Sequence, residues 1–319
     1  MIVLLGLILS PADSLSVMFW NVENFFDWRN DSTTVSDLEF SAAGERHWTW
    51  KRFQAKANAF AKALFWVETE TGRLPDIIGL EEVENAFVLR QVLQKTALRK
   101  LDYKYVHYDS PDRRGIDVAL LYRSSRLELL DSKPSHLYAA DTVMATRDIL
   151  LCVFKRAGPL VMPDALSFAV LVNHHPSKYG GAAESEPRRR IAVERLRFLA
   201  DSLAAIGLDR IIAGGDFNDT PDNPVFGLLG PALAPTHMNL FRRGFGTIKY
   251  DGKWDLIDHI YVSPALTPLS RMRILRIPFL LTRDTVHSGE KPLRTYTGPR
   301  HTGGVSDHLP VLLEVSLPP

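Results

Sequence analysis

The feature that most constrains the fold of this 319-residue chain is a series of short apolar runs that end abruptly in polar residues. One run, Ile211 to Ala213, leads through two glycines into Asp216, Phe217 and Asn218. A short apolar run bounded by turn residues is typical of a strand buried on both faces. The glycines permit close backbone approach or unusual dihedral angles. Asp216 and Asn218 lie two residues apart, so an extended backbone points both side chains the same way. A plain polar turn is the alternative.

Five further strand-like segments carry acids, amides or histidines at or near one end. In open α/β sheets a ligand site lies beyond the carboxyl ends of the strands, so we expect these side chains to gather at one edge. Carboxylates, an amide and histidines suit a hard divalent cation and acid–base catalysis, and oxygen ligands favour Mg²⁺, Mn²⁺ or Ca²⁺ over zinc. The residues concerned are Asn21, Glu23, Glu81, Glu82, His174, His175, Asp258, His259, Asp307 and His308.

Three segments have apolar residues at helical spacing, namely 48–72, 85–101 and 186–207, and glycines end the first and third. Strands and helices alternate, although not strictly, and hairpin-like strand pairs intervene. This order predicts an α/β domain with mixed sheets. No linker divides the chain, so we predict one domain over residues 14–317.

The first residues contain an apolar run over 2–9 that is too short to span a bilayer. Ser10 and Ala12 are the small residues expected before a cleavage site, so residues 1–13 are interpreted as a signal segment and the protein as exported. No Lys or Arg precedes the run. A strand-like extension or a wrongly assigned start is therefore the alternative.

The lone cysteine and the overall charge exclude several classes of protein. Cys152 stands in an apolar run and is expected to be a buried apolar filler. One cysteine excludes an intramolecular disulfide and a cysteine-based metal cluster. The net charge of +1 provides no strong global field that would favour nucleic acid or an anionic membrane, although a local basic groove would still be compatible with it.

The motifs together resemble the endonuclease/exonuclease/phosphatase superfamily, and most closely its bacterial members. The resemblance covers almost the whole chain, with the motifs in family order. It implies a four-layer α/β sandwich, in which two mixed β-sheets pack face to face with helices on the outside. The matching stretches are "FWNVENFFD", "PDIIGLEEVEN", "DRRGIDVALLYR", "VNHHPSKYGG", "GGDFNDTP", "WDLIDHIYVS" and "SDHLPV".

The resemblance implies a metal site formed by Asn21, Glu82 and Asp307, with Mg²⁺ as the expected ion and Mn²⁺ or Ca²⁺ as alternatives. Glu81 stands where the family often has glutamine, and we interpret it as a charge on the rim of the site. Glu23 occupies the place of an acidic or polar residue that supports the metal ligands. A solvated surface charge is an equal alternative for Glu23.

The resemblance also implies the catalytic residues. Asp216 would orient or deprotonate the attacking water, and Asn218 would donate to the scissile phosphate. His308 would contact the phosphate or the water, with Asp258 fixing its tautomer and favouring its protonated form. His174 would be a phosphate ligand or an acid, and Asp117 is the nearest candidate to pair with it.

Several other polar residues have a weaker functional interpretation. His175 stands where relatives often have tryptophan, and we expect a structural or rim position rather than a catalytic one. Lys178 and Arg114 are interpreted as substrate-binding. Lys178 stands where relatives often have arginine and offers a phosphate a point charge rather than a fork. Arg114 is a candidate for contacts with phosphates beyond the reacting one. Arg188 to Arg190 open a helix, and we expect two of the three to be solvated.

These residues predict metal-dependent hydrolysis of phosphate esters, most directly of nucleic-acid phosphodiesters. A phosphatase or lipid phosphodiesterase of the inositol-phosphate or sphingomyelin type is the alternative. A non-catalytic binding module is less favoured, because no expected ligand is missing. We expect a monomer whose partner is a nucleic acid or another phosphoester substrate, without a stable protein partner.

Overall fold

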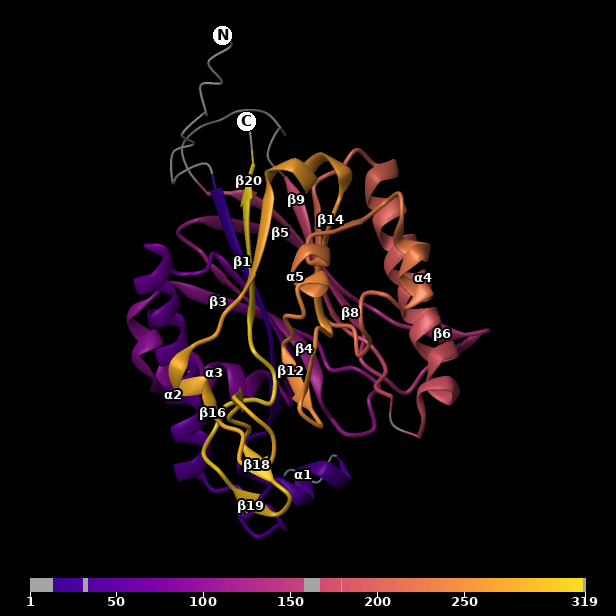
Figure 1. Cartoon of the computed structure of the whole chain (residues 1–319). Helices are drawn as coiled ribbons and strands as arrows, with labels where there is room; N and C mark the ends of the chain where they lie inside the picture. The colour runs from indigo at the N-terminus through magenta and orange to yellow at the C-terminus, as the bar shows by residue number, and fades with distance from the viewer. Residues whose placement is uncertain (1–13, 31–33, 158–166, 179, 318–319) are drawn as a thin grey trace.

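A computed structural model describes residues 14–30, 34–157, 167–178 and 180–317 of the chain. The segment interpreted as a signal, residues 1–13, lies outside these residues. Two six-stranded mixed sheets stand at the centre of the molecule (Figure 1). The first sheet contains, in spatial order, β15 (Ser270–Ile274), β20 (Val311–Ser316), β1 (Ser14–Phe25), β2 (Ile77–Val83), β4 (Asp117–Arg123) and β3 (Tyr103–His107). The second contains β11 (Ala234–Pro235), β14 (Asp258–Val262), β10 (Ile211–Asp216), β9 (Phe168–His174), β8 (Ile149–Arg156) and β5 (Leu127–Ser135).

Helices cover the outer face of each sheet, so the predicted four-layer sandwich is confirmed (Figure 1). Helices α2 (Trp50–Thr71) and α3 (Ala86–Lys95) share an apolar core with the first sheet. Helix α4 (Ala182–Ala205) packs on the second sheet. A third core lies between the two sheets and contains Cys152, which is fully buried as expected.

Local signals explain where the helices end, and they correct two predicted boundaries. Helix α2 begins after Thr49, whose hydroxyl accepts a hydrogen bond from the Arg52 N–H, and it ends at Gly72 in the left-handed conformation. The helix expected over 85–101 ends at Lys95, because Thr96 is extended and caps a separate 3₁₀ turn. Helix α4 begins about one turn earlier than expected.

Short elements complete the described chain. The helices and 3₁₀ turns are α1 (Val35–Glu39), α5 (Met238–Arg242), η1 (Ala97–Lys100), η2 (Pro224–Leu229), η3 (Pro264–Leu269) and η4 (Pro278–Leu280). The small hairpins are β6–β7 (Tyr138–Ala139, Thr142–Val143), β12–β13 (Ile248–Tyr250, Lys253–Asp255), β16–β17 (Leu281–Arg283, Glu290–Pro292) and β18–β19 (Tyr296–Thr297, Arg300–His301). Among the described residues, no helix is long and apolar enough to cross a membrane.

The sheet topology brings the polar residues to one edge, although not always at the end of a strand. Strands β1 and β2 run parallel, as do β9 and β10, so their carboxyl ends meet. Strand β14 is antiparallel to β10, and its first residue, Asp258, pairs with Asp216. Asp307 and His308 precede β20, which is antiparallel to β1. Asp258, Asp307 and His308 therefore reach the edge from the starts of antiparallel strands rather than from the carboxyl ends of parallel ones.

Candidate active site

Left-handed backbone conformations at the strand ends orient four polar residues of the site. Glu23, Asn24, Glu82 and Asn218 all have positive φ angles, between 46° and 64°. Such angles cost a non-glycine residue about 1–3 kcal/mol and cluster at functional sites. The pairing of β1 with β2 is irregular at these positions, and the Asn24 N–H donates to Glu82 Oε2 at 2.8 Å. The bulged backbone thus turns the Glu82 carboxylate and holds it by a hydrogen bond.

Asp258 and His308 form a buried pair, with Asp258 Oδ2 at 2.9 Å from His308 Nδ1. Burial alone opposes charge on the His308 imidazole. The carboxylates of Asp258 and Asp216 outweigh that effect and raise the pKa of His308 well above its ordinary value. The environment therefore favours the protonated form of the imidazole, whose Nε2 lies 3.9 Å from Asp216 Oδ2.

Asp216 lies at the centre of the site and accepts several hydrogen bonds. Its Oδ2 accepts from Asn21 Nδ2 at 3.0 Å, and its Oδ1 accepts from the Asn218 backbone N–H at 2.8 Å. Burial raises the pKa of Asp216 to about 7, with His308 opposing and Asp258 adding to the shift. A carboxylate with this pKa exchanges protons near neutral pH, as a general base must.

The two asparagines of the site are oriented by the protein itself. Asn218 Nδ2 donates to the backbone oxygen of His175 at 2.9 Å and lies 3.2 Å from Asp216 Oδ2. Asn21 Oδ1 accepts from the Glu23 N–H. The Asn218 amide, expected to donate to a phosphate, therefore has protein partners that a substrate would have to replace.

His174 lies between the candidate base and a candidate metal ligand. Its Nε2 is 3.6 Å from Asp216 Oδ2 and 3.9 Å from Glu82 Oε1, and its buried Nδ1 has no hydrogen-bond partner among the described residues. Burial, and then the positive charge of Arg147, lower the pKa of His174 well below its ordinary value. The expected partner, Asp117, instead pairs with His107 at 3.2 Å, so that prediction is wrong.

Two of the three residues predicted to bind a metal, Glu82 and Asp307, are the most open acids of the site, whereas Asn21 is a buried amide. The side chains of Glu82 and Asp307 are 13% and 25% exposed, whereas those of Asp216 and Asp258 are each 2% exposed. The carboxylates of Glu82 and Asp307 and the amide oxygen of Asn21 are donors of the kind that Mg²⁺ and Mn²⁺ prefer. The assignment of these three residues to a metal remains a prediction.

Glu81 corrects the prediction of a rim charge, because it is fully buried. It precedes the irregular pairing of β2, so its side chain lies between the two sheets, where a Cβ added to Gly215 would be 2.8 Å from Glu81 Oε1. Neither carboxyl oxygen has a hydrogen-bond partner among the described residues. Burial, followed by the charges of Asp258 and Asp216, raises the pKa of Glu81 well above its ordinary value.

Glu23 is buried rather than solvated, which favours the supporting role over the surface alternative. Its Oε2 accepts from the Thr295 N–H at 2.7 Å, and its Oε1 is 3.1 Å from Arg294 Nη2. The same Arg294 nitrogen is 3.0 Å from Asp307 Oδ2. Arg294 thus joins the end of β1 to a candidate metal ligand, and the sequence alone had not indicated it.

Two further buried cations at the site were also missed. Lys56, on the apolar face of α2, donates to the backbone oxygen of Glu23 and to Thr295 Oγ1. Arg147 donates to the backbone oxygen of His175 at 2.7 Å and pairs with Asp112 at 3.0 Å. Lys56 could have been recognised from the sequence, because it is a lysine at core spacing in an amphipathic helix. Arg147 could not, because nothing nearby in the sequence indicates its partners.

The other cations and the histidine considered in the sequence have different environments in the structure. Lys178 pairs with Asp219 at 2.6 Å, and the exposed Arg114 lies beside Asp112. Arg189 is buried against Asp219, whereas Arg188 and Arg190 are exposed, which matches the expected split. His175 is buried and its ring lies 4.4 Å from that of Phe217, which is a structural position.

The fold and the site define a class of enzyme that cleaves phosphate esters. The sequence model of the Endonuclease/Exonuclease/phosphatase family matches residues 16–317. The chain belongs to this family, whose members are hydrolases of phosphate ester bonds.

The chain is distantly similar to a curated protein and to solved structures. The "Protein angel" of Drosophila melanogaster is 26% identical over 214 residues, which covers 63% of this chain and 57% of that protein. The chain thus spans little more than half the length of this curated relative. A Danio rerio TDP2 structure in complex with a single-strand DNA product has a TM-score of 0.55 at 16% identity, covering 94% of this chain and 98% of the other. A mannosyl-6-phosphatase of Bacteroides thetaiotaomicron has a TM-score of 0.55 at 16% identity, with the same two coverages.

Proposed function

We propose that this protein hydrolyses nucleic-acid phosphodiesters with the help of a hard divalent cation. The observation that carries the proposal is the buried arrangement of Asp216 beside the Asp258–His308 pair, at the edge where the open carboxylates of Glu82 and Asp307 lie. A cation held by Asn21, Glu82 and Asp307 would stabilise negative charge that develops on the phosphate.

The protein side chains then divide the remaining work according to their protonation states. Asp216, with its pKa near 7, accepts a proton from the attacking water. His308 is protonated and stabilises the extra negative charge of the transition state. His174 is neutral, so it acts as a hydrogen-bonding group rather than as a cationic acid.

The choice of nucleic acid as substrate rests on two supporting observations. The exposed Arg113 and Arg114 stand in the loop before β4, at its active-site end, where they would reach phosphates beyond the reacting one. The TDP2 structure of similar fold was solved with a single-strand DNA product. The similar fold of a mannosyl-6-phosphatase favours a phosphatase as the second candidate. The full set of acids and histidines at one edge argues against a non-catalytic module.

A substrate panel tests the proposal. The protein would be incubated with Mg²⁺ or Mn²⁺ and single-stranded DNA, duplex DNA, RNA, a sugar 6-phosphate, inositol phosphates or sphingomyelin. We expect chelator-sensitive cleavage of a nucleic acid, absent in the Asp216→Asn variant. Release of phosphate from the sugar or inositol esters alone would favour the phosphatase, and no turnover of any substrate would contradict enzymatic function.

A further inference from the structure

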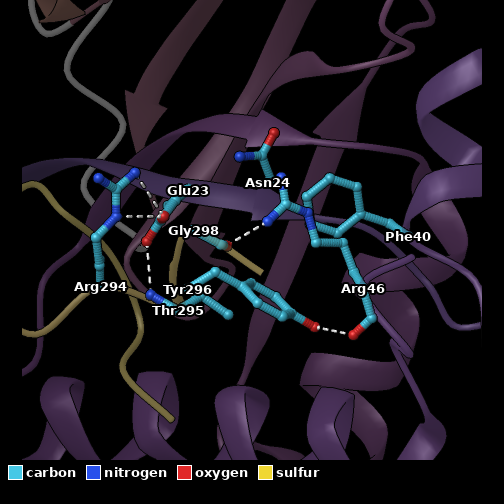
Figure 2. A pocket seen from close by; sticks show the side chains of 8 residues that line it. All are labelled: Glu23, Asn24, Phe40, Arg46, Arg294, Thr295, Tyr296 and Gly298. Carbon is cyan, nitrogen blue, oxygen red and sulfur yellow. Dashed lines mark hydrogen bonds and ion pairs between the residues drawn. The ribbon is translucent and has the colours of Figure 1, made fainter. Parts of the chain in front are cut away.

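A small pocket opens beside the candidate metal ligands, between the end of β1, the loop that precedes α2 and the β18–β19 hairpin (Figure 2). Its volume is about 160 Å³, and Asn24, Arg46, Arg294 and Tyr296 are among its lining residues. Asn24 donates its backbone N–H to Glu82, and Arg294 pairs with Asp307. The pocket therefore adjoins both carboxylates proposed to hold the cation.

Two guanidinium groups from different parts of the chain line this pocket (Figure 2). Arg46 lies over the ring of Tyr296, 5.3 Å from the ring centroid, and its Nη1 donates to the backbone oxygen of Gly298. Its Nε is 2.7 Å from Glu39 Oε1. These contacts hold the guanidinium in place, and its Nη2 has no partner among the described residues. A prepositioned guanidinium with a free amino group suits an oxyanion.

The polar groups that remain in the lining also favour an anion. Glu23 is the one acid of the lining, and its carboxyl oxygens are already bound by Arg294 and the Thr295 N–H. The side-chain amide of Asn24 has no hydrogen-bond partner in the part of the chain that the structure describes. Arg294 Nη1 likewise has none there. Three unused donor groups surround one occupied carboxylate.

We propose that this pocket binds a second phosphate of the substrate, next to the phosphate that is hydrolysed. The inference rests on the proposed phosphoesterase function and narrows its substrate class to esters that carry two neighbouring phosphates. The volume is below the roughly 300–1,000 Å³ of pockets that enclose whole ligands, so it suits a single phosphate rather than a nucleoside. Arg46 would then contact the second phosphate and not the one that is hydrolysed. It is therefore a residue that determines specificity rather than a catalytic residue.

Two chromogenic probes that differ by one phosphate test this inference. Thymidine 5′-(p-nitrophenyl phosphate) and the same ester with an added 3′-phosphate both release p-nitrophenol, so the bond that breaks and the leaving group are matched. We expect kcat/KM to be about tenfold higher for the probe with two phosphates, mainly through a lower KM, as one charge-assisted hydrogen-bonded contact would provide. The Arg46→Gln variant should lose most of that preference.

Matched variants separate the pocket from general effects of charge. Arg188→Gln removes an exposed arginine on α4 and should keep the preference of the wild type. Asn24→Gly removes the amide but suits the positive φ of that position, and should lower the preference by a smaller factor. Melting curves of each variant show whether it is folded, and Asn24→Gly keeps the test valid if Arg46→Gln does not fold.

The outcomes distinguish the two levels of the proposal. Hydrolysis of neither probe, nor of the wider substrate panel, would overturn the proposed function itself. Equal hydrolysis of both probes by the wild type would overturn the second-phosphate site and leave the function standing. A preference that survives in both pocket variants would place the recognition elsewhere and would also overturn the inference.

Discussion

Neighbouring residues in this protein have opposite environments, and the glutamate pair at the end of β2 shows it. Glu82 reaches the open edge of the site, whereas Glu81 is enclosed between the sheets without a hydrogen-bond partner among the described residues. An enclosed carboxyl of this kind retains its proton, because ionisation without a partner costs several kcal/mol. The charge that a residue carries therefore depends on the side of the strand from which it projects.

Glu81→Gln should stabilise the protein at neutral and alkaline pH. The raised pKa means that the folded state keeps a proton that the unfolded state loses above about pH 4.5, so stability falls as pH rises from there towards the folded pKa. Glutamine removes this dependence. Urea unfolding in a chelator, at pH 4.5 and at pH 8, measures the effect. A variant that is equally stabilised at both pH values would contradict the argument.

The Asp258–His308 pair should behave as one catalytic unit. Asp258→Asn removes the carboxylate that orients the imidazole, and His308→Ala removes the imidazole itself, so each should lower kcat by roughly 10²–10⁴-fold, the range of general acid–base effects. Because the residues act together, the double variant should be hardly worse than either single one. The measurement is turnover of one phosphodiester at saturating metal.

The control for this pair is His259, the next residue of β14. Its ring is buried in the outer core of the second sheet and stacks on His237 at 4.4 Å, away from the Asp258–His308 contact. His259→Phe should therefore affect stability more than turnover. Losses from Asp258 and His308 that multiply would refute the unit, and a loss of turnover at His259 as large as theirs would identify the wrong residue.

At the scale of elements, two glycines and one phenylalanine determine how closely the sheets approach. Phe19 of β1 projects between the sheets, against Gly79 of β2 and Gly214 of β10. A Cβ at Gly214 would lie 2.4 Å from the Phe19 ring, and one at Gly79 would also lie 2.4 Å from it. Gly215, in contrast, has a φ of 131° that L side chains rarely adopt. The glycine pair before Asp216 thus serves both uses that its sequence suggested, close approach and unusual backbone.

Gly214→Ala should destabilise the protein by about 1–3 kcal/mol, the usual cost of overpacking a filled core. Either the Phe19 ring or the separation of the sheets must shift to admit the methyl group. Chemical denaturation of the variant measures the loss. Gly227→Ala is the matched control, because a Cβ there meets nothing within 4 Å. Equal effects at the two positions would disprove the packing argument.

A stack of buried rings links β14 to the segments that follow β9, β10 and β11, and it should make the fold sensitive to acid. Burial lowers the pKa of His175 to about 3, with Arg147 contributing, and that of His237 to about 4. Unfolded histidines titrate near 6.5, so stability should be complete above that pH and fall as the pH drops below it. His237→Phe should make this decline shallower, at a cost of about 1 kcal/mol for the lost hydrogen bond to Ile260. Unfolding free energies between pH 4 and 7 provide the test, and an unchanged slope would contradict it.

At the scale of the whole molecule, one group of carboxylates comes from both sheets. A cation that binds there should therefore stabilise the whole fold. Glu82 comes from the first sheet, Asp216 from the second, and Asp307 from the segment before β20. A cation that binds only the folded chain raises the melting temperature by mass action. We expect Mn²⁺ or Mg²⁺ to raise it and excess chelator to abolish activity.

Glu82→Gln isolates the metal site from the rest of the fold. The variant should need at least about tenfold more Mn²⁺ for the same thermal shift, because a neutral amide replaces a charged oxygen ligand. The control is Glu70→Gln, because Glu70 is exposed. Glu84→Gln is less suitable, since the Glu84 carboxylate accepts a hydrogen bond from the Asp27 N–H. Full activity in chelator, or an unchanged metal titration for Glu82→Gln, would contradict the assignment.

The sequence by itself was sufficient for the features that depend on local pattern. Apolar spacing located α2, β1, β2 and β10, and the order of motifs implied the four layers. The amide and acid pairs at strand ends were recognisable because a strand of period two places them on one side. Cys152 was recognisable as core from its apolar neighbours alone.

The Asp258–His308 contact was implied by the motifs, but only the tertiary structure decided several other polar contacts. A bulge in β2 buries Glu81 and leaves Glu82 at the open edge of the site. Strand pairing places Asp117 beside His107 rather than beside His174. Lys56 and Arg294 reach the site from segments that are distant in sequence. The physical reason is that hydrophobic periodicity constrains each element locally. The partners of a buried charged residue, in contrast, lie tens to hundreds of residues away in the sequence, and no local pattern identifies them.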